Sequence, residues 1–242
     1  WYAGGYINYY YYGFVIVGVL VKWLGIVPAI AYNIILPSLF SLVGIGAFGV
    51  AWNIFSMQNK GALVRKITLS RRLFSNPAVL AGIAAILLVL ILGNLGTVRM
   101  IWHGLQRIGS PDGMIDKAGF IERWTWTFQG IGDFFKGEKL PFYPGDWYWI
   151  PSRALPEEPI TEFPFFTFLY ADMHAHMIAL PVTLLAIAWS LSLLGNRWQR
   201  LCGWKGWLEK AWILIFGAIV VGALKPTNTW DLPTYLLLGV CI

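Results

Sequence analysis

The sequence predicts an all-α polytopic integral membrane protein, with about five transmembrane helices, outer-face amphipathic helices and a large outer loop. Three observations predict this class. Hydrophobic residues make up 57% of the 242 residues and charged residues only 12%, against about 25% charged in a typical soluble protein. Apolar runs long enough to cross a bilayer recur along the chain. The basic residues gather mainly in two short connections between these runs, which indicates membrane orientation rather than nucleic-acid binding.

The opening segment, residues 1–27, is rich in tyrosine and is expected on the outer surface. Both basic connections must lie inside, so the apolar run that starts at Pro28 has to enter from outside. The stretch from Ile7 to Ile26 could also span, but it would then place residues 1–6 in the cytoplasm. We therefore favour a surface helix with its tyrosines at the membrane–water interface.

The later apolar runs are expected to cross the membrane. Residues 28–96 hold two of them around a basic cytoplasmic loop at 58–76. Residues 165–242 hold the others around a second basic loop at 195–210, with an outer turn at 225–233. The chain starts without methionine and stops within an apolar run, so we expect a piece of a longer protein. The expected spans are Pro28–Met57, Pro77–Gly96, a helix from about Met177 to Leu194, Ala211–Leu224 and a run that begins at Thr234.

Residues 97–164 form the large outer loop in this scheme. An apolar stripe at helical spacing predicts an amphipathic helix near 119–136, which rests on the bilayer or packs on the protein's own spans. The proline-rich stretch 141–164 predicts a stiff, non-helical loop that covers a site or acts as a spacer. The stripe consists of Ile121, Trp124, Phe128, Ile131 and Phe135.

The strongest candidate site is the stretch ADMHAHM, where Asp172, His174 and His176 alternate at the mouth of an expected span. Ionisable residues at such a position are costly and usually functional. In an extended backbone all three side chains converge, whereas on a helix Asp172 and His176 share a face and His174 points elsewhere. A converged set suits a divalent metal ion or acid–base catalysis. The alternative is that the histidines only hold the loop to the span.

A second candidate is KPTNTWDLP, at 225–233. Lys225 could hold a phosphate, Asn228 and Asp231 could bind hydroxyls, and Trp230 could stack on a sugar or a lipid head group. The alternative is an ordinary turn, with Lys225 and Trp230 as interface anchors.

Weaker candidates lie elsewhere on the expected outer face. Asn8 and Tyr10 belong to the tyrosine-rich segment, for which interface anchoring is the simpler interpretation. Arg99 follows a span and could meet an anionic head group. No P-loop, GxGxxG, HExxH or GxSxG motif occurs, so nucleotide hydrolysis and cofactor oxidoreduction have no positive support.

Three motifs carry a family resemblance: GGYINYYYYG, EFPFFTFLYADMHAHMIALP and KPTNTWDLPTY. Together they resemble the YYY-type family of uncharacterised polytopic membrane proteins, whose members are longer. More loosely, the first sixty or so residues look like the start of membrane glycosyltransferases that use lipid-phosphate-linked sugars. In those enzymes a catalytic acid precedes the corresponding segment, so that acid cannot be assigned on this chain.

The looser resemblance implies a membrane enzyme that works on the outer face of the plasma membrane. Asp172 and the histidines would bind a metal or orient the acceptor hydroxyl. Lys225, with Arg99 or Arg153, would steady the lipid phosphate that leaves. The expected partners are membrane lipids and a lipid-phosphate-linked sugar, and not nucleic acid. The alternative is a non-enzymatic structural or accessory subunit that contacts other membrane subunits.

Overall fold

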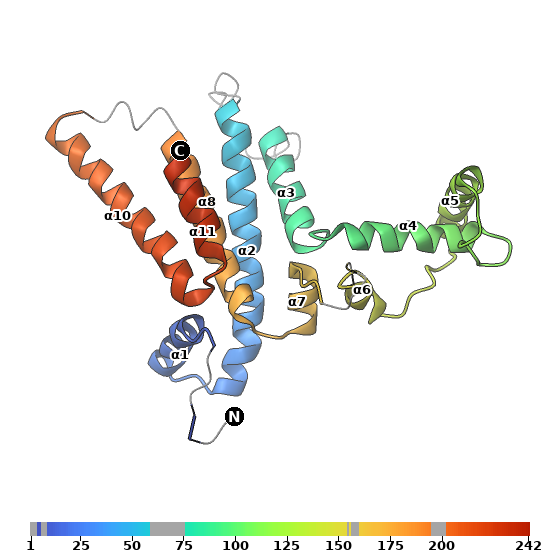
Figure 1. Ribbon diagram of the computed structural model, residues 1–242, viewed down its shortest axis with the longest axis horizontal. Helices are drawn as coiled ribbons and strands as arrows, with labels where there is room; N and C mark the ends of the chain where they lie inside the picture. The colour runs from blue at the N-terminus through green and yellow to red at the C-terminus, as the bar shows by residue number, and fades with distance from the viewer. Residues whose placement is uncertain (1–3, 6–8, 59–75, 154, 156–159, 195–201) are drawn as a thin grey trace. The chain divides into compact units, whose positions relative to one another are not determined.

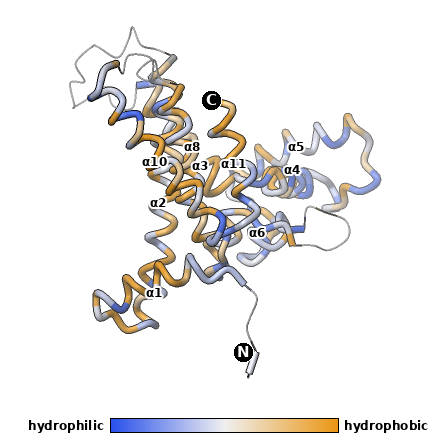
Figure 2. The backbone as a smooth tube through the Cα atoms, turned by 60° about the vertical axis from the view of Figure 1, so that its left-hand side comes forward, coloured by the Kyte–Doolittle hydropathy of each residue, from blue (hydrophilic) through white to orange (hydrophobic). Residues whose placement is uncertain are grey.

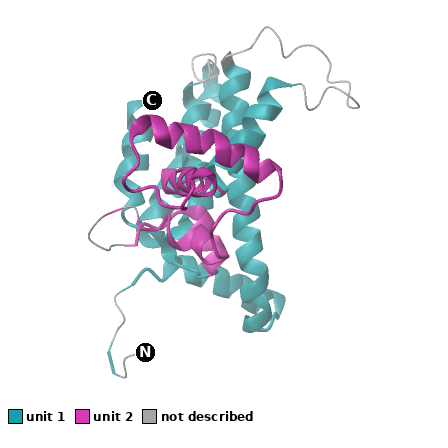
Figure 3. Cartoon of the chain, turned by 90° about the vertical axis from the view of Figure 1, so that its right-hand side faces the viewer, with its two compact units in different colours: residues 1–90, 172–242 teal, residues 91–171 magenta. Residues whose placement is uncertain are grey.

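The computed structural model describes residues 4–5, 9–58, 76–153, 155, 160–194 and 202–242, which form helices and no strand. Most of the first basic loop and the start of the second lie outside these residues, and so does Asn8. The chain divides into two compact units, residues 1–90 with 172–242 and residues 91–171 (Figure 3).

The first unit contains the long apolar helices (Figures 1 and 2). Helix α2 packs against both α3 and α8, and α10 and α11 pack against α8 and against each other. The helices of this unit are α1 (Tyr12–Leu24), α2 (Pro28–Gln58), α3 (Pro77–Leu90), α8 (Ala175–Leu194), α10 (Gly203–Thr227) and α11 (Asp231–Cys241).

Three helices, α2, α8 and α10, are long and apolar enough to cross a membrane. A fourth crossing results if α3 and the following α4 (Leu95–Gly109) are counted as one broken span. The structure thus shows three to four of the about five expected spans, and the run expected from Thr234 falls within the 11 residues of α11. We place α4 outside the spans because Arg99, His103 and Arg107 recur along it at every fourth position.

Small residues let the long helices approach one another, as is usual in membrane proteins. A side chain at Gly82 of α3 would collide with Phe48 of α2, and Gly46 of α2 faces Leu184 of α8. The Trp189 ring of α8 lies directly over Gly217, and its Nε1 donates to the Ile213 carbonyl at 2.9 Å.

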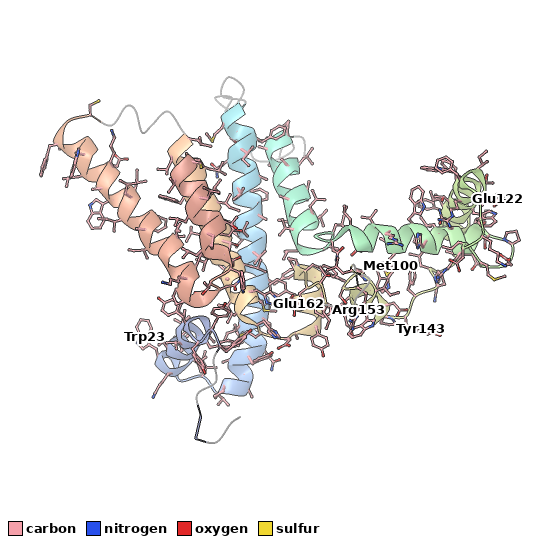
Figure 4. The ribbon with its side chains drawn as sticks, in the orientation of Figure 1. Trp23, Met100, Glu122, Tyr143, Arg153 and Glu162 are labelled. Carbon is pink, nitrogen blue, oxygen red and sulfur yellow. The ribbon has the colours of Figure 1, made fainter. Side chains whose placement is uncertain are left out.

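Helix α1 has 13 residues, about 20 Å at 1.5 Å per residue, and is too short to span. It ends at Gly25, whose φ of 67° suits glycine. Gly13 packs against Ile178 of α8, while Trp23 is 83% exposed (Figure 4). The length agrees with a non-spanning helix, and a position on the outer surface stays a prediction.

The boundaries of the last helices differ from those expected. Helix α10 begins at Gly203, so the second half of the predicted loop 195–210 is helical. It ends at Thr227, which shortens the predicted turn 225–233 to residues 228–230.

The second unit consists of α4, α5 (Phe120–Phe135), α6 (Asp146–Trp149) and α7 (Pro164–Tyr170). The sequence predicted α5 closely but treated α4 as loop. The α4–α5 contact uses glycines, because a side chain at Gly130 would strike the Leu105 carbonyl and one at Gly109 the Trp126 carbonyl. Buried Gln106 donates from Nε2 to Thr127 Oγ1 at 3.3 Å, and Trp102 meets Trp124 edge-to-face at 4.8 Å.

Most of the predicted apolar stripe of α5 points away from α4. Ile121, Phe128 and Phe135 are 80%, 67% and 83% exposed, whereas Thr127 and Gly130 are buried. Trp124 is the exception, since its ring meets the Trp102 ring of α4. Contact of the rest of the stripe with the bilayer or with the protein's own spans stays a prediction.

The proline-rich stretch is not wholly non-helical, since α6 forms one turn within it and α7 starts at Pro164. Helix α8 begins at Ala175, two residues before the expected start of this span at about Met177. The preceding α7 ends at Tyr170 and is capped by Ala171, which has a left-handed φ of 58°. This break leaves Asp172 and His174 outside regular helix, with His176 in the first turn of α8.

Candidate functional site

The Asp172, His174 and His176 side chains form a connected row in the first unit. His174 Nδ1 lies 3.1 Å from Asp172 Oδ2, and the rings of His174 and His176 stack with centroids 5.6 Å apart. The backbone turns at the same place, since the His174 amide donates to the Asp172 carbonyl at 3.0 Å. The geometry is neither of the two expected, because the helix starts between the two histidines.

The contact between Asp172 and His174 Nδ1 leaves Nε2 as the imidazole nitrogen that can accept a proton. When Nδ1–H donates to the Asp172 carboxylate, Nε2 keeps its lone pair and can accept a proton. A carboxylate that fixes the tautomer and orientation of a histidine is a recurrent feature of general-base sites. Both side chains remain reachable, with 39% of the His174 side chain and 49% of the Asp172 side chain exposed.

The KPTNTWDLP motif contributes a second carboxylate. Residues 228–230 join α10 to α11, and Asn228 Nδ2 donates to Asp231 Oδ2 at 3.0 Å. Burial raises the pKa of Asp231, and this effect exceeds the opposing effects of the Asn228 hydrogen bond and of the His176 imidazole. Asp231 therefore lies within electrostatic reach of His176, and the structure brings together two motifs that are 55 residues apart in the sequence (His176 to Asp231).

The row therefore runs from Asp172 through His174 and His176 towards Asp231. It combines one exposed carboxylate, two imidazoles and a partly buried carboxyl whose pKa is raised by burial. Carboxylates and imidazoles that lie side by side can serve general acid–base catalysis. Among the described residues, no group of three His, Cys, Asp or Glu side chains is arranged to hold a metal ion.

Tyr32 is a neighbour of this site that sequence reasoning missed. Its hydroxyl, near the start of α2, accepts a hydrogen bond from the Met173 amide at 3.3 Å. That bond ties the turn between Asp172 and His174 to a helix 141 residues earlier in the chain. A tyrosine inside a long apolar run gives no sequence signal for this role.

The other residues of the second motif are less closely held. Lys225 is exposed in the last turn of α10, where its carbonyl accepts from the Thr229 hydroxyl at 2.7 Å. Trp230 is 82% exposed. Tyr10 is half-buried, and its ring meets that of its neighbour Tyr9 with the centroids 5.7 Å apart.

Arg99 and Arg153 belong to the second unit and lie together there. Both line a cavity of about 360 Å³ with His103, Met100 and Trp149. The Arg153 guanidinium carbon lies 4.3 Å from the centre of the Trp149 ring. Burial lowers the pKa of His103, and so do the charges of Arg99, Arg107 and Arg123, against a smaller opposing effect of Asp116.

We expect Asp231→Asn to leave thermal stability at neutral pH unchanged or higher. Because the pKa of Asp231 is raised from 3.8, the folded state binds a proton at this carboxyl more tightly than the unfolded state does. Wild type should lose stability as pH rises from about 4 through the raised folded value, whereas the neutral amide should not. Melting curves of both proteins across pH measure this difference. A stability gap that narrows as pH rises contradicts the assignment.

Comparison with known proteins gives one match. The family described as "Uncharacterized membrane protein (DUF2298)" matches residues 1–242. No curated protein and no solved structure matches the chain. The match supports an uncharacterised membrane protein family, but it carries neither the YYY-type name nor a link to glycosyltransferases.

Proposed function

Starting from the chain's membership of the uncharacterized membrane protein family DUF2298, we propose a membrane enzyme that transfers a sugar from a lipid phosphate to an acceptor hydroxyl. In this proposal the reaction takes place on the outer face of the plasma membrane, near the first turn of α8 and the last turn of α10. The substrates are a lipid-phosphate-linked sugar in the bilayer and an acceptor that arrives from outside.

One observation carries the proposal: the Asp172–His174 pair continues through His176 towards Asp231. These side chains stand at the first turn of α8 and at the turn that follows α10, both helices long enough to span. Ionisable groups at the ends of two membrane spans cost free energy, and such groups usually have a function. A lipid-linked substrate would present its polar head at that depth.

Each residue of the row is assigned a role in the transfer reaction. His174 Nε2 takes the proton of the acceptor hydroxyl as the hydroxyl oxygen bonds to the anomeric carbon. The bond between that carbon and the phosphate oxygen breaks, and the lipid phosphate leaves with the electron pair. Asp172 stabilises the imidazolium that forms, and a proton passes from the row to the phosphate or to water.

Lys225 is the first-unit residue best suited to the leaving phosphate. It is exposed at the end of α10, six residues before Asp231, and an ammonium is a compact charge that binds phosphate oxygens. Trp230, also exposed, offers a flat surface for a sugar ring. The roles of Lys225 and Trp230 are argued from the chemistry of their side chains and from their closeness to Asp231 in the sequence.

The test is turnover by the purified wild-type protein in nanodiscs. A polyprenyl-phosphate-linked sugar with a radiolabel in the sugar is supplied with a membrane extract as the source of acceptors. We expect acceptor-dependent release of polyprenyl phosphate and transfer of the label. If no lipid-linked sugar is consumed and the protein purifies in a fixed ratio with other membrane subunits, the accessory-subunit alternative replaces the enzyme.

A further inference from the structure

The second unit contains a cavity lined by Arg99, His103 and Arg153. It is formed by one face of the start of α4 and by the chain that follows α6. At about 360 Å³ it falls near the lower end of the size range of small-molecule sites. Its lining consists of Gly96, Arg99, Met100, His103, Trp149, Ile150, Pro151 and Arg153.

The wall of the cavity is tied together by hydrogen bonds. Asn94 caps α4 by accepting from the Gly96 amide at 2.7 Å, and its Nδ2 donates to the Pro151 carbonyl at 2.7 Å. Ser152 is fully buried, and its hydroxyl donates to the Trp149 carbonyl at 2.6 Å. A side chain at Gly96 would come within 3.2 Å of the Pro151 backbone. The two segments therefore hold the cavity open between them in a defined shape.

The charge of the cavity is positive. Arg99 and His103 are four residues apart on α4 and so share a face. Arg153 follows α6 and stacks on the Trp149 ring. None of the described lining residues is acidic. Burial lowers the pKa of His103, and the charges of Arg99, Arg107 and Arg123 lower it further. A bound anion would offset the charges of these arginines.

We propose that this cavity binds a phosphate group, with the guanidinium groups of Arg99 and Arg153 on its oxygens and His103 beside them. Guanidinium groups present paired N–H donors that match phosphate oxygens. Met100, Ile150 and Trp149 supply apolar surface for the group attached to the phosphate. The site lies wholly in the second unit and does not depend on the transfer reaction proposed for the first.

Binding is measured on the full chain with two probes that separate the sources of a phosphate. Soluble glycerol 3-phosphate is titrated by calorimetry into protein in detergent, and phosphatidic acid is offered in phosphatidylcholine nanodiscs. Binding of the soluble probe indicates a free phosphate ester, whereas binding of phosphatidic acid alone indicates a lipid head group. Either result supports the site.

Arg99→Ala and Arg153→Ala should each weaken binding of the active probe about tenfold or more, because each removes a charge-assisted contact. Arg153→Lys should weaken binding less, since a charge remains without the paired donors. Lys136→Ala is the matched control, because Lys136 is an exposed cation of the same unit paired with Asp133 at 2.9 Å. Circular dichroism checks that each variant is folded.

Two results overturn the proposal. One is a wild-type protein that binds neither probe more strongly than phosphatidylcholine alone. The other is binding by folded Arg99→Ala and Arg153→Ala variants that equals wild type and the Lys136→Ala control. Loss of transfer with intact phosphate binding, or the reverse, separates this site from the one proposed in the first unit.

Discussion

His174→Ala is expected to reduce sugar transfer by a factor of about 10² to 10⁴, the usual contribution of a positioned general base. The reason is local, since His174 is the imidazole that is held by Asp172 at 3.1 Å and stacked on His176. Its side chain is 39% exposed, so its removal should leave folding intact. Initial rates of label transfer, with melting temperature measured in parallel, separate catalysis from stability.

Asp172→Asn provides the companion test. It keeps the shape of the side chain but removes the charge that stabilises an imidazolium, so transfer should fall by a large factor with little change in melting temperature. Asp133→Asn is the matched control, because Asp133 pairs with Lys136 on the surface of the second unit. Equal activity in the Asp172→Asn and Asp133→Asn variants would remove the row from the mechanism.

Gly130→Ala is expected to destabilise the α4–α5 pair by about 1–3 kcal/mol, the typical effect of overpacking a close contact. The new methyl group would meet the Leu105 carbonyl of α4, which is backbone and cannot rotate away. The two helices must then separate, and the Gln106–Thr127 hydrogen bond and the Trp102–Trp124 ring contact should weaken. Hydrogen exchange in α4 and α5 peptides, followed by mass spectrometry, reports this loosening.

Gly132→Ala is the control for that prediction. It lies on the same helix two residues later, and a methyl group there meets nothing within 4 Å. Exchange in α5 should stay the same or slow, because alanine favours helix over glycine by up to about 1 kcal/mol. Equal protection in the two variants would contradict the glycine-mediated contact.

Much of the fold could be predicted because the bilayer imposes it. A helix that crosses a membrane needs a long apolar run, so α2 and α8 were visible as Pro28–Met57 and as the run that ends at Leu194. Helix α4 was missed because its polar face, with Arg99 and His103, resembles loop composition. The spacing of the α5 stripe shows which residues share a face but does not show what that face meets.

The residues of the candidate site were recognisable, but their arrangement was not. ADMHAHM and KPTNTWDLP were each predicted as candidate sites because they contain ionisable residues at the ends of apolar runs. Their convergence depends on the turn at residues 171–174 and on the packing of α8 against α10 and α11. Neither the left-handed Ala171 nor the Tyr32 hydrogen bond to Met173 has a signal in the sequence.

The central claim is that these two motifs form one site, and disulfide trapping tests it most directly. His176→Cys and Asp231→Cys are combined in a chain in which Cys202 and Cys241 are serine, and linked peptides are identified by mass spectrometry after mild oxidation. The control is His176→Cys with native Cys241, ten residues further along α11 and thus about 15 Å from Asp231. We predict a disulfide in the first protein and none in the control; equal trapping in both, or trapping in neither, would contradict the claim.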